Sequence, residues 1–211
     1  MRGLKLCIIA IIITAGLFAQ NNPEAVKILD RFSSAALGAP SVTMIFNLIT
    51  TDQGEGSSDT INGSVIISKD KYKIELPDNN IWFNGETSWN YLSAEKEVTI
   101  AKPDRNDNSF QSRPSSIFSL YKKGYKIRLI EERSDSYTID LYPEDNKSDF
   151  IRIRLTLGKS SPDLKSIEYK KKDGIIIALK VREYNLKQRY DASTFIFSPE
   201  KYKDVEIIDM R

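Results

Sequence analysis

The 211-residue sequence contains no histidine and a single cysteine, Cys7. Without histidine the chain cannot use Ser-His-Asp or Cys-His catalysis, and it lacks the commonest metal ligand among side chains. Cys7 lies in a short apolar stretch at the N-terminus, so the rest of the chain has no thiol for disulfides, nucleophilic catalysis or metal binding. There is also no phosphate-cradling glycine loop, because Gly54-Glu55-Gly56 stands alone in a polar link. We therefore expect no enzyme activity, no cofactor and no metal site.

Carboxylates are the remaining candidates for catalysis. Most of them lie in turns or alternate along the polar faces of predicted strands, as Glu75 does. Such scattered acids are typical of a solvated surface. Two of them could still meet in three dimensions as the acid and base of a glycosidase. A hydrolase built from sheet carboxylates stays open as an alternative.

The first 19 residues have the pattern of a secretory signal peptide. Arg2 and Lys5 form a basic region, residues 6–18 are mostly apolar, and Ala19 is a plausible last residue before cleavage. The apolar run is shorter than the about 20 residues that span a bilayer. A retained membrane anchor is the alternative. We expect an exported protein in which residues 20–211 form one domain.

The charge of the exported chain is balanced. Once Arg2 and Lys5 are removed, 29 basic side chains face 29 acidic ones. A neutral chain is a poor binder of nucleic acid, whose affinity depends on neutralising phosphates. The runs Lys122-Lys123 and Lys170-Lys171-Lys172 adjoin glycine turn signals and are typical of solvated turns. We expect no nucleic-acid partner and a monomeric protein.

An amphipathic helix is predicted at the start of the exported chain. Asn22 can act as its N-cap, Pro23 suits the first helical position, and Gly38 followed by a proline ends it. Its apolar stripe consists of Val26, Leu29 and Phe32 at helical spacing. This stripe must pack against another element.

From Val42 onward the apolar period changes to two, which predicts about a dozen strands, the last at Thr194–Phe197. Residues 71–76 show the alternation clearly, and Asn84-Gly85 predicts a tight type I′ hairpin turn. Strands joined by short links pair as antiparallel neighbours. We expect a mainly β protein with short helices (α+β), built on one curved antiparallel sheet or open barrel.

Residues 106–124 interrupt the strands. The segment is polar at first, and Pro114 then suits a helix start that Gly124 ends. An apolar stripe on this helix would cover one face of the sheet, either as a movable lid or as an ordinary core-capping helix. The residues of the stripe are Ile117, Phe118, Leu120 and Tyr121.

Aromatic side chains are concentrated in the first half of the sheet, with Trp82, Trp89 and Tyr91 close together in sequence. Large rings on a concave sheet either pack against covering helices or line a pocket for an apolar ligand. Two modest helices cannot cover a sheet of a dozen strands. An exported protein that keeps a large apolar surface usually keeps it for binding.

Several segments resemble the LolA family of periplasmic lipoprotein carriers. The strand pair at residues 63–72 is similar to a Gly-x-Leu-x-aliphatic-x-basic-Pro-x-x-aromatic motif of that family. Residues 84–91 are similar to its Asp-Gly-x-x-Leu-Trp-x-Tyr hairpin, and the Asp173-Gly174 turn fits the same pattern. The family's closing motif looks like residues 195–199 and 205–209. Together these segments cover most of the exported chain in the order of the family.

The resemblance implies a half-barrel of about eleven strands with helices over a hydrophobic cavity for acyl chains. It also implies a periplasmic carrier that takes lipoproteins from an inner-membrane transporter to an outer-membrane acceptor. Lys69 stands where the family often has an arginine that contacts the lid, and it is our candidate for lid control. The lid would consist of Ile117, Phe118, Leu120 and Tyr121. The cavity would be walled by Phe46, Leu48, Val65, Ile67, Tyr72, Ile74, Leu76, Trp89 and Tyr91.

The same half-barrel is compatible with a second function. A lipid- or stress-sensing regulatory module would bind its ligand in a similar cavity and pass the signal to a membrane-anchored partner. A stable complex with such a partner would favour the sensor over the carrier. For the carrier function, Phe118→Asp is expected to weaken acyl-chain binding without unfolding the protein.

Overall fold

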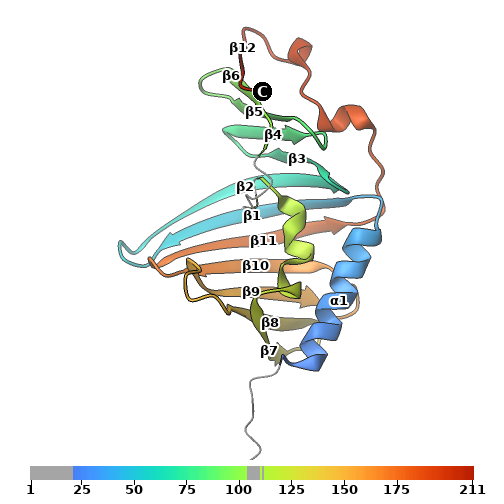
Figure 1. Cartoon of the computed structure of the whole chain (residues 1–211), viewed down its shortest axis with the longest axis vertical. Coiled ribbons are helices and arrows are strands. Elements are labelled where there is room, and N and C mark those ends of the chain that lie inside the picture. The colour runs from blue at the N-terminus through green and yellow to red at the C-terminus, as the bar shows by residue number, and fades with distance from the viewer. Residues whose placement is uncertain (1–20, 104–109, 111) are drawn as a thin grey trace, which may run out of the picture.

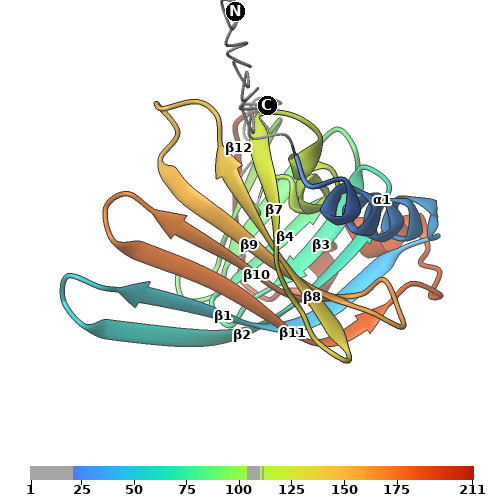
Figure 2. The same cartoon turned by 90° about the horizontal axis from the view of Figure 1, so that it is seen from below.

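The computed structural model describes residues 21–103, 110 and 112–211. The expected signal peptide and part of the expected polar link therefore lie outside the described residues. Within them, one helix and several short 3-10 turns accompany a single curved sheet of twelve strands (Figure 1). Figure 2 shows that the sheet is strongly curved and that α1 lies on its concave side. The predicted fold class is confirmed, with one strand more than the resemblance implied.

The strands form two antiparallel meanders that meet at β1 and β11. Their order across the sheet is β12-β6-β5-β4-β3-β2-β1-β11-β10-β9-β8-β7, and only β12 pairs in parallel, with β6. The first meander comprises β1 (Val42–Asp52), β2 (Ser57–Ser68), β3 (Lys71–Glu75), β4 (Asn79–Phe83), β5 (Ser88–Leu92) and β6 (Glu97–Ala101). The second comprises β7 (Tyr125–Glu132), β8 (Ser136–Pro143), β9 (Phe150–Gly158), β10 (Leu164–Lys171) and β11 (Ile175–Asn185), and β12 is Glu206–Asp209.

The chain crosses from β6 to β7 in two 3-10 turns, η1 (Pro114–Phe118) and η2 (Leu120–Lys122). We call residues 112–124 the lid segment. It lies over the same face of the sheet as α1 (Figure 1). The prediction of one regular helix here was wrong, because the segment turns twice within nine residues.

Helix α1 (Pro23–Gly38) is specified by its own sequence, as predicted. The side chain of Asn22 accepts hydrogen bonds of 3.0 Å from the backbone N–H groups of Glu24 and Ala25, which satisfies two free donors of the first turn. The preceding Asn21 accepts a 2.8 Å bond from the backbone of Ile127 in β7. The helix therefore starts at a fixed point on the edge of the sheet.

The C-terminal segment departs from the predicted strand pattern. Residues 194–197 were expected to form a strand, but Ala192–Phe195 is a 3-10 turn, η3, followed by η4 (Pro199–Lys201). Phe195 and Phe197 are buried while Ile196 is exposed, so the alternation is real. The alternation arises because this segment packs onto the sheet, and not because it pairs with a neighbouring strand.

The Asn84-Gly85 turn also differs from the prediction. A type I′ turn centred on these two residues needs a positive φ at both, but only Gly85 has one, at 101°. The side chain of Asn84 instead accepts 2.9 Å bonds from the N–H groups of Glu86 and Thr87. The connection between β4 and β5 is therefore a four-residue link closed by an asparagine side chain.

Gly63 marks the tightest approach between a strand and the core beneath it. It pairs with Phe46 across β1 and β2, and a Cβ atom at Gly63 would lie 2.7 Å from Leu76 Cδ2 and from Phe46 Cε2. Phe46 is fully buried and cannot move away freely. A glycine in a strand is otherwise unfavourable, so close packing accounts for its presence here.

Gly63→Ala is expected to lower the free energy of unfolding by about 1–3 kcal/mol, the usual cost of overpacking a core. Urea unfolding followed by circular dichroism measures the change. Gly38→Ala is the matched control, because nothing lies within 4 Å of the added Cβ and the site is helical. The control should be unchanged or slightly more stable. Equal stability of both variants and the parent would contradict the packing account.

Candidate functional site

An apolar cavity of about 780 Å³ lies between the lid segment and the second meander. The hairpin ends of β1–β2 and β10–β11 extend well away from α1, so the helix covers only part of the concave face (Figure 2). Leu37, at the end of α1, and Phe110 also reach the cavity. The described residues that line it are Leu37, Lys69, Phe110, Arg113, Ser115, Ser116, Ser119, Leu120, Tyr125, Phe150, Ile153, Tyr169 and Ile177.

Strand register places the floor of this cavity in one row across three strands. Tyr169 in β10 pairs with Ile153 in β9 on one side and with Ile177 in β11 on the other. Phe150 would face away from Ile153 in a regular strand, since the two are three residues apart. A register shift opposite Lys170 and Lys171 turns the Phe150 side chain toward the other face of β9. The ring of Phe150 therefore packs against that of Tyr169, with 5.6 Å between the ring centroids.

The polar groups that line the cavity fall into two sets, the tyrosines of the sheet and a set from other elements. Burial raises the pKa of the Tyr169 and Tyr125 phenols, so both stay neutral at physiological pH. The charged and hydroxyl side chains come from the β2–β3 turn and the lid segment, namely Lys69, Arg113, Ser115, Ser116 and Ser119. A neutral, largely apolar floor combined with polar groups from other elements suits an amphiphile with a hydrocarbon part.

Most residues expected to wall the cavity lie on the predicted face but are packed as core. Phe46, Val65, Ile67 and Ile74 are buried under α1 and the lid segment, with Leu48 and Leu76 packed half-buried against the same core. Tyr72 is buried as well, and its hydroxyl donates a 3.0 Å bond to the backbone oxygen of Ser112. None of these residues lines the 780 Å³ cavity. A direct ligand contact by any of them stays a prediction.

Trp89 and Tyr91 lie on the opposite, convex face, which corrects their assignment to the cavity wall. Ile81 belongs to the main core, so its neighbour Trp82 must point to the other side of β4, and Trp82 pairs with Trp89. The rings on this side pack under the C-terminal segment. Tyr91 lies 4.6 Å from Tyr202 between ring centroids, and Trp82 lies 5.4 Å from Phe197.

The expected lid residues divide into two groups. Ile117, Phe118 and Tyr121 are buried. The ring of Phe118 packs edge-on against that of Phe32 in α1, with 5.7 Å between the ring centroids. Leu120 is half-buried and reaches the cavity. The first group therefore caps the core, which was the alternative to a lid. A carboxylate at Phe118 would be buried without a partner, so Phe118→Asp should destabilise the fold, contrary to our expectation from the sequence.

Tyr121 ties the lid segment to α1 through a 2.5 Å hydrogen bond from its hydroxyl to Asp30 Oδ1. Burial and then this bond raise the pKa of Tyr121 to about 12, above its ordinary value of 10.0. Folding therefore favours the neutral phenol. The resulting stabilisation is complete below pH 10 and is lost as the pH rises through the folded pKa.

Tyr121→Phe is expected to cost about 1 kcal/mol of unfolding free energy at pH 7, because Asp30 is exposed and regains water. The difference between parent and variant should shrink from about pH 10 upward and reverse before the pH reaches about 12, because the shift of the tyrosine pKa from 10.0 to about 12 outweighs the roughly 1 kcal/mol gained at pH 7. Urea unfolding of both proteins at several pH values measures it. A difference that does not change with pH would show that the hydroxyl is not coupled to folding.

Lys69 stands at the border between the lid segment and the sheet. It occupies the β2–β3 turn with a positive φ of 58°, and it lines the cavity together with Arg113 and Ser115 of the lid segment. Control of the lid by Lys69 stays a prediction.

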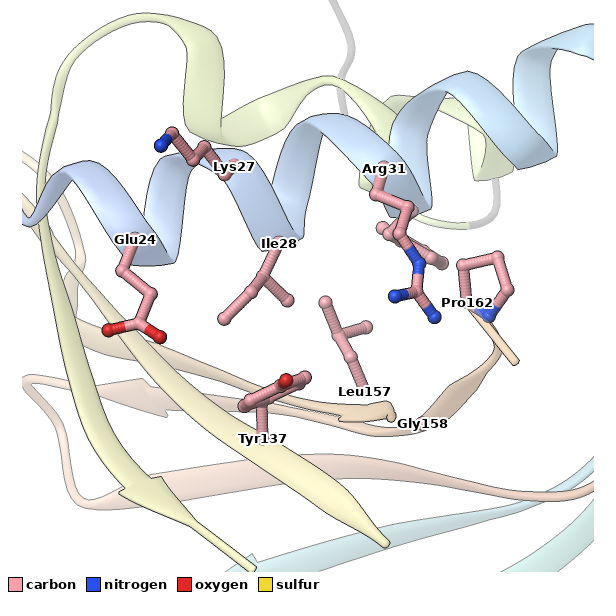
Figure 3. A pocket seen from close by; sticks show the side chains of 9 residues that line it. Glu24, Lys27, Ile28, Arg31, Tyr137, Leu157, Gly158 and Pro162 are labelled. Carbon is pink, nitrogen blue, oxygen red and sulfur yellow. The ribbon is translucent and has the colours of Figure 1, made fainter. Parts of the chain in front are cut away.

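A smaller cavity of about 170 Å³ lies between α1 and strands β8 and β9 (Figure 3). Glu24, Ile28 and Arg31 point into it from the helix, opposite Tyr137 and Leu157 of the sheet. The Arg31 guanidinium donates a 2.6 Å bond to the backbone oxygen of Lys159, which fastens the helix here. The volume of this smaller cavity is below that of typical ligand pockets, which is about 300–1,000 Å³. We interpret it as a packing gap beside a helix anchor.

Among residues 21–103, 110 and 112–211, no helix is long and apolar enough to cross a membrane. The same residues contain no group of three or more His, Cys, Asp or Glu side chains arranged to hold a metal ion.

A family model described as outer membrane lipoprotein carrier protein LolA matches residues 15–174. No curated protein matches the chain. Among solved structures, an uncharacterised conserved protein from Thermus thermophilus is 14% identical, with 88% of this chain and 99% of that chain covered and a TM-score of 0.58. This likeness extends to the fold alone.

Two further structures are more distant. A putative outer membrane lipoprotein-sorting protein domain from Vibrio parahaemolyticus is 11% identical over 82% of this chain and 96% of that chain, with a TM-score of 0.45. The Mycobacterium tuberculosis lipoprotein LppX is 10% identical over 81% of this chain and 100% of that chain, with a TM-score of 0.42.

Proposed function

Because the chain belongs to the LolA family of outer membrane lipoprotein carriers, we propose that it carries acyl chains of lipoproteins or related lipids in the 780 Å³ cavity. The observation that carries this proposal is the row of Ile153, Tyr169 and Ile177 across β9, β10 and β11, open beneath the lid segment. Such a row offers a continuous apolar floor along which a hydrocarbon chain can lie.

Burial of hydrocarbon supplies enough free energy for a carrier. Each methylene removed from water contributes about 0.8 kcal/mol. About ten methylenes would thus give roughly 8 kcal/mol, which corresponds to a micromolar dissociation constant before ordering costs are subtracted. Affinity in this range allows both uptake and release. No chemical step is needed for this function.

Opening of the cavity would involve the lid segment. Leu120 reaches the bound chain, whereas Phe118 and Tyr121 attach the segment to α1 through Phe32 and Asp30. These two attachments must loosen for the segment to move away from the sheet. The lid segment thereby links access to the cavity with its contacts on α1.

The remaining parts of the proposal concern location and partners. Residues 1–19 would act as a cleavable signal peptide, and residues 20–211 would work in the periplasm as a monomeric domain. An inner-membrane lipoprotein-releasing transporter would deliver the cargo, and an outer-membrane acceptor would receive it. Both partners are suggested by the family alone.

Titration with a synthetic triacylated lipopeptide and with a fluorescent fatty acid tests the proposal. We expect saturable binding of each, mutual competition, and transfer of the lipopeptide from donor to acceptor vesicles by the protein. The same lipopeptide without acyl chains is the control and should not bind. Absence of saturable binding by both acylated probes would refute the function.

A further inference from the structure

A second, polar cavity of about 690 Å³ adjoins the apolar one. Lys69, Arg113 and Ser115 line both cavities, whereas Asp70, Glu86 and Lys102 line the polar one and are absent from the apolar lining. A chain held in the apolar cavity would therefore place the group attached to it between two cations and a hydroxyl. We propose that the ligand carries an anionic group, a phosphate or carboxylate, directly beside its acyl chains, as acidic glycerophospholipids do. This inference rests on the proposed function.

The two cations that line both cavities, Lys69 and Arg113, come from different elements. Lys69 belongs to the β2–β3 turn of the sheet, and Arg113 directly precedes η1 in the lid segment. An anion between them would connect sheet and lid segment. Arginine and lysine both bind phosphate oxygens, the first through a planar fork of donors and the second as a point charge.

The backbone of Lys69 is in a conformation that lysine rarely adopts. Ser68 pairs with Lys71, so the turn has only two central residues, and Lys69 has a φ of 58°. Glycine adopts this region freely, whereas a side chain there costs free energy. The two-residue turn accounts for this φ, which Lys96 and Asp204 also adopt, so a glycine at position 69 would keep the turn without the side chain.

Among the described residues that line the polar cavity, the carboxylates Asp70 and Glu86 do not line the apolar one. Asp70 packs over the next turn, where its Oδ2 would lie 2.9 Å from a Cβ added to Gly85. Of the described charged residues, those shared by the two cavities, Lys69 and Arg113, are both basic, whereas the acidic ones line the polar cavity alone. This order favours a ligand with one anion next to its chains over a neutral glyceride.

Displacement of a fluorescent fatty acid by lipids with identical oleoyl chains tests the inference. We expect the parent protein to bind dioleoylphosphatidylglycerol about tenfold more tightly than dioleoylglycerol at low salt, with the preference shrinking as salt rises. Lys69→Gln should lose most of this preference, and Lys69→Arg should keep it. Glycerol 3-phosphate alone should not compete, because it lacks the chains.

Lys180→Gln is the matched control for loss of one positive charge. Lys180 is exposed on β11, and its neighbour Leu179 is buried in the core on the other face. This variant should keep the preference. Thermal unfolding checks the fold, and Lys69→Gly should melt no lower than the parent because it relieves the unfavourable φ.

Each outcome has a distinct meaning. Equal affinity of the parent for both lipids, or an undiminished preference in Lys69→Gln, would overturn the anionic-ligand inference and leave acyl-chain binding intact. Competition by glycerol 3-phosphate would also overturn it, because the site would then be a phosphate site independent of chains. Failure of every oleoyl lipid and of the fatty acid to bind would instead refute the proposed function.

Discussion

Replacement of Ile177 by glutamate should weaken the binding of a fluorescent fatty acid about 100-fold. A carboxylate in the apolar floor must either give up its hydration when the fatty acid binds or hold water next to the bound hydrocarbon chain, and both are unfavourable. Ile177 is half-buried, so its replacement leaves room for a charged group and should not unfold the protein. Fluorescence titration measures the affinity. Circular dichroism and thermal unfolding verify that the variant is folded.

Ile176→Glu is the control for this experiment. Ile176 is also half-buried and is the adjacent residue of β11, but it points to the convex face because neighbouring strand residues alternate. The control should bind the probe as the parent does. If both glutamate variants bound equally well, or both lost binding equally, the cavity could not be the binding site.

Asp140→Ala should lower the free energy of unfolding by about 3 kcal/mol, as expected when one partner of a buried ion pair is removed. Asp140 is only 1% exposed on β8. Its carboxylate accepts 2.6 Å and 2.8 Å bonds from the Arg154 guanidinium and a 3.0 Å bond from the Tyr142 hydroxyl. Removal of the carboxylate would leave a partly buried guanidinium without its counter-charge.

Asp173→Ala is the matched comparison for stability. Asp173 also pairs with a cation, Lys171 at 2.6 Å, but both lie at an exposed turn where an ion pair contributes less than about 1 kcal/mol. Urea unfolding should separate the two variants clearly. Equal losses would contradict the role of burial. Neither variant should alter fatty-acid affinity, since Asp140 and its neighbours Ile139 and Leu141 point to opposite faces of β8.

The parts of the fold that depend on local sequence were predictable. The N-cap at Asn22, the proline at the first helical position and the end at Gly38 fix α1 within the chain itself. Strand alternation likewise identified the sheet. Alternation failed at Phe195 and Phe197, because apolar residues two apart can also be buried by a turn that packs onto a sheet.

The candidate site was less predictable because it depends on which strands are neighbours. The strands within residues 150–177 were predicted from the sequence. Their position relative to β1 was not, because it depends on the β1–β11 pairing that joins the two meanders. Phe150 faces the cavity only through a register shift. Alternation along β4 makes Ile81 and Trp82 face opposite ways, but only the three-dimensional curvature decides which of them faces the concave side.

The central claim is that a hydrocarbon chain lies on the floor formed by β9, β10 and β11 beneath the lid segment. Photo-crosslinking with a fatty acid that bears a diazirine in its chain, followed by peptide mass spectrometry, tests this claim most directly. We expect saturable labelling of peptides that contain Leu120, Phe150 and Tyr169, suppressed by excess unlabelled fatty acid. Labelling that cannot be saturated, or that falls on Tyr91 and Tyr202 of the convex face, would contradict it.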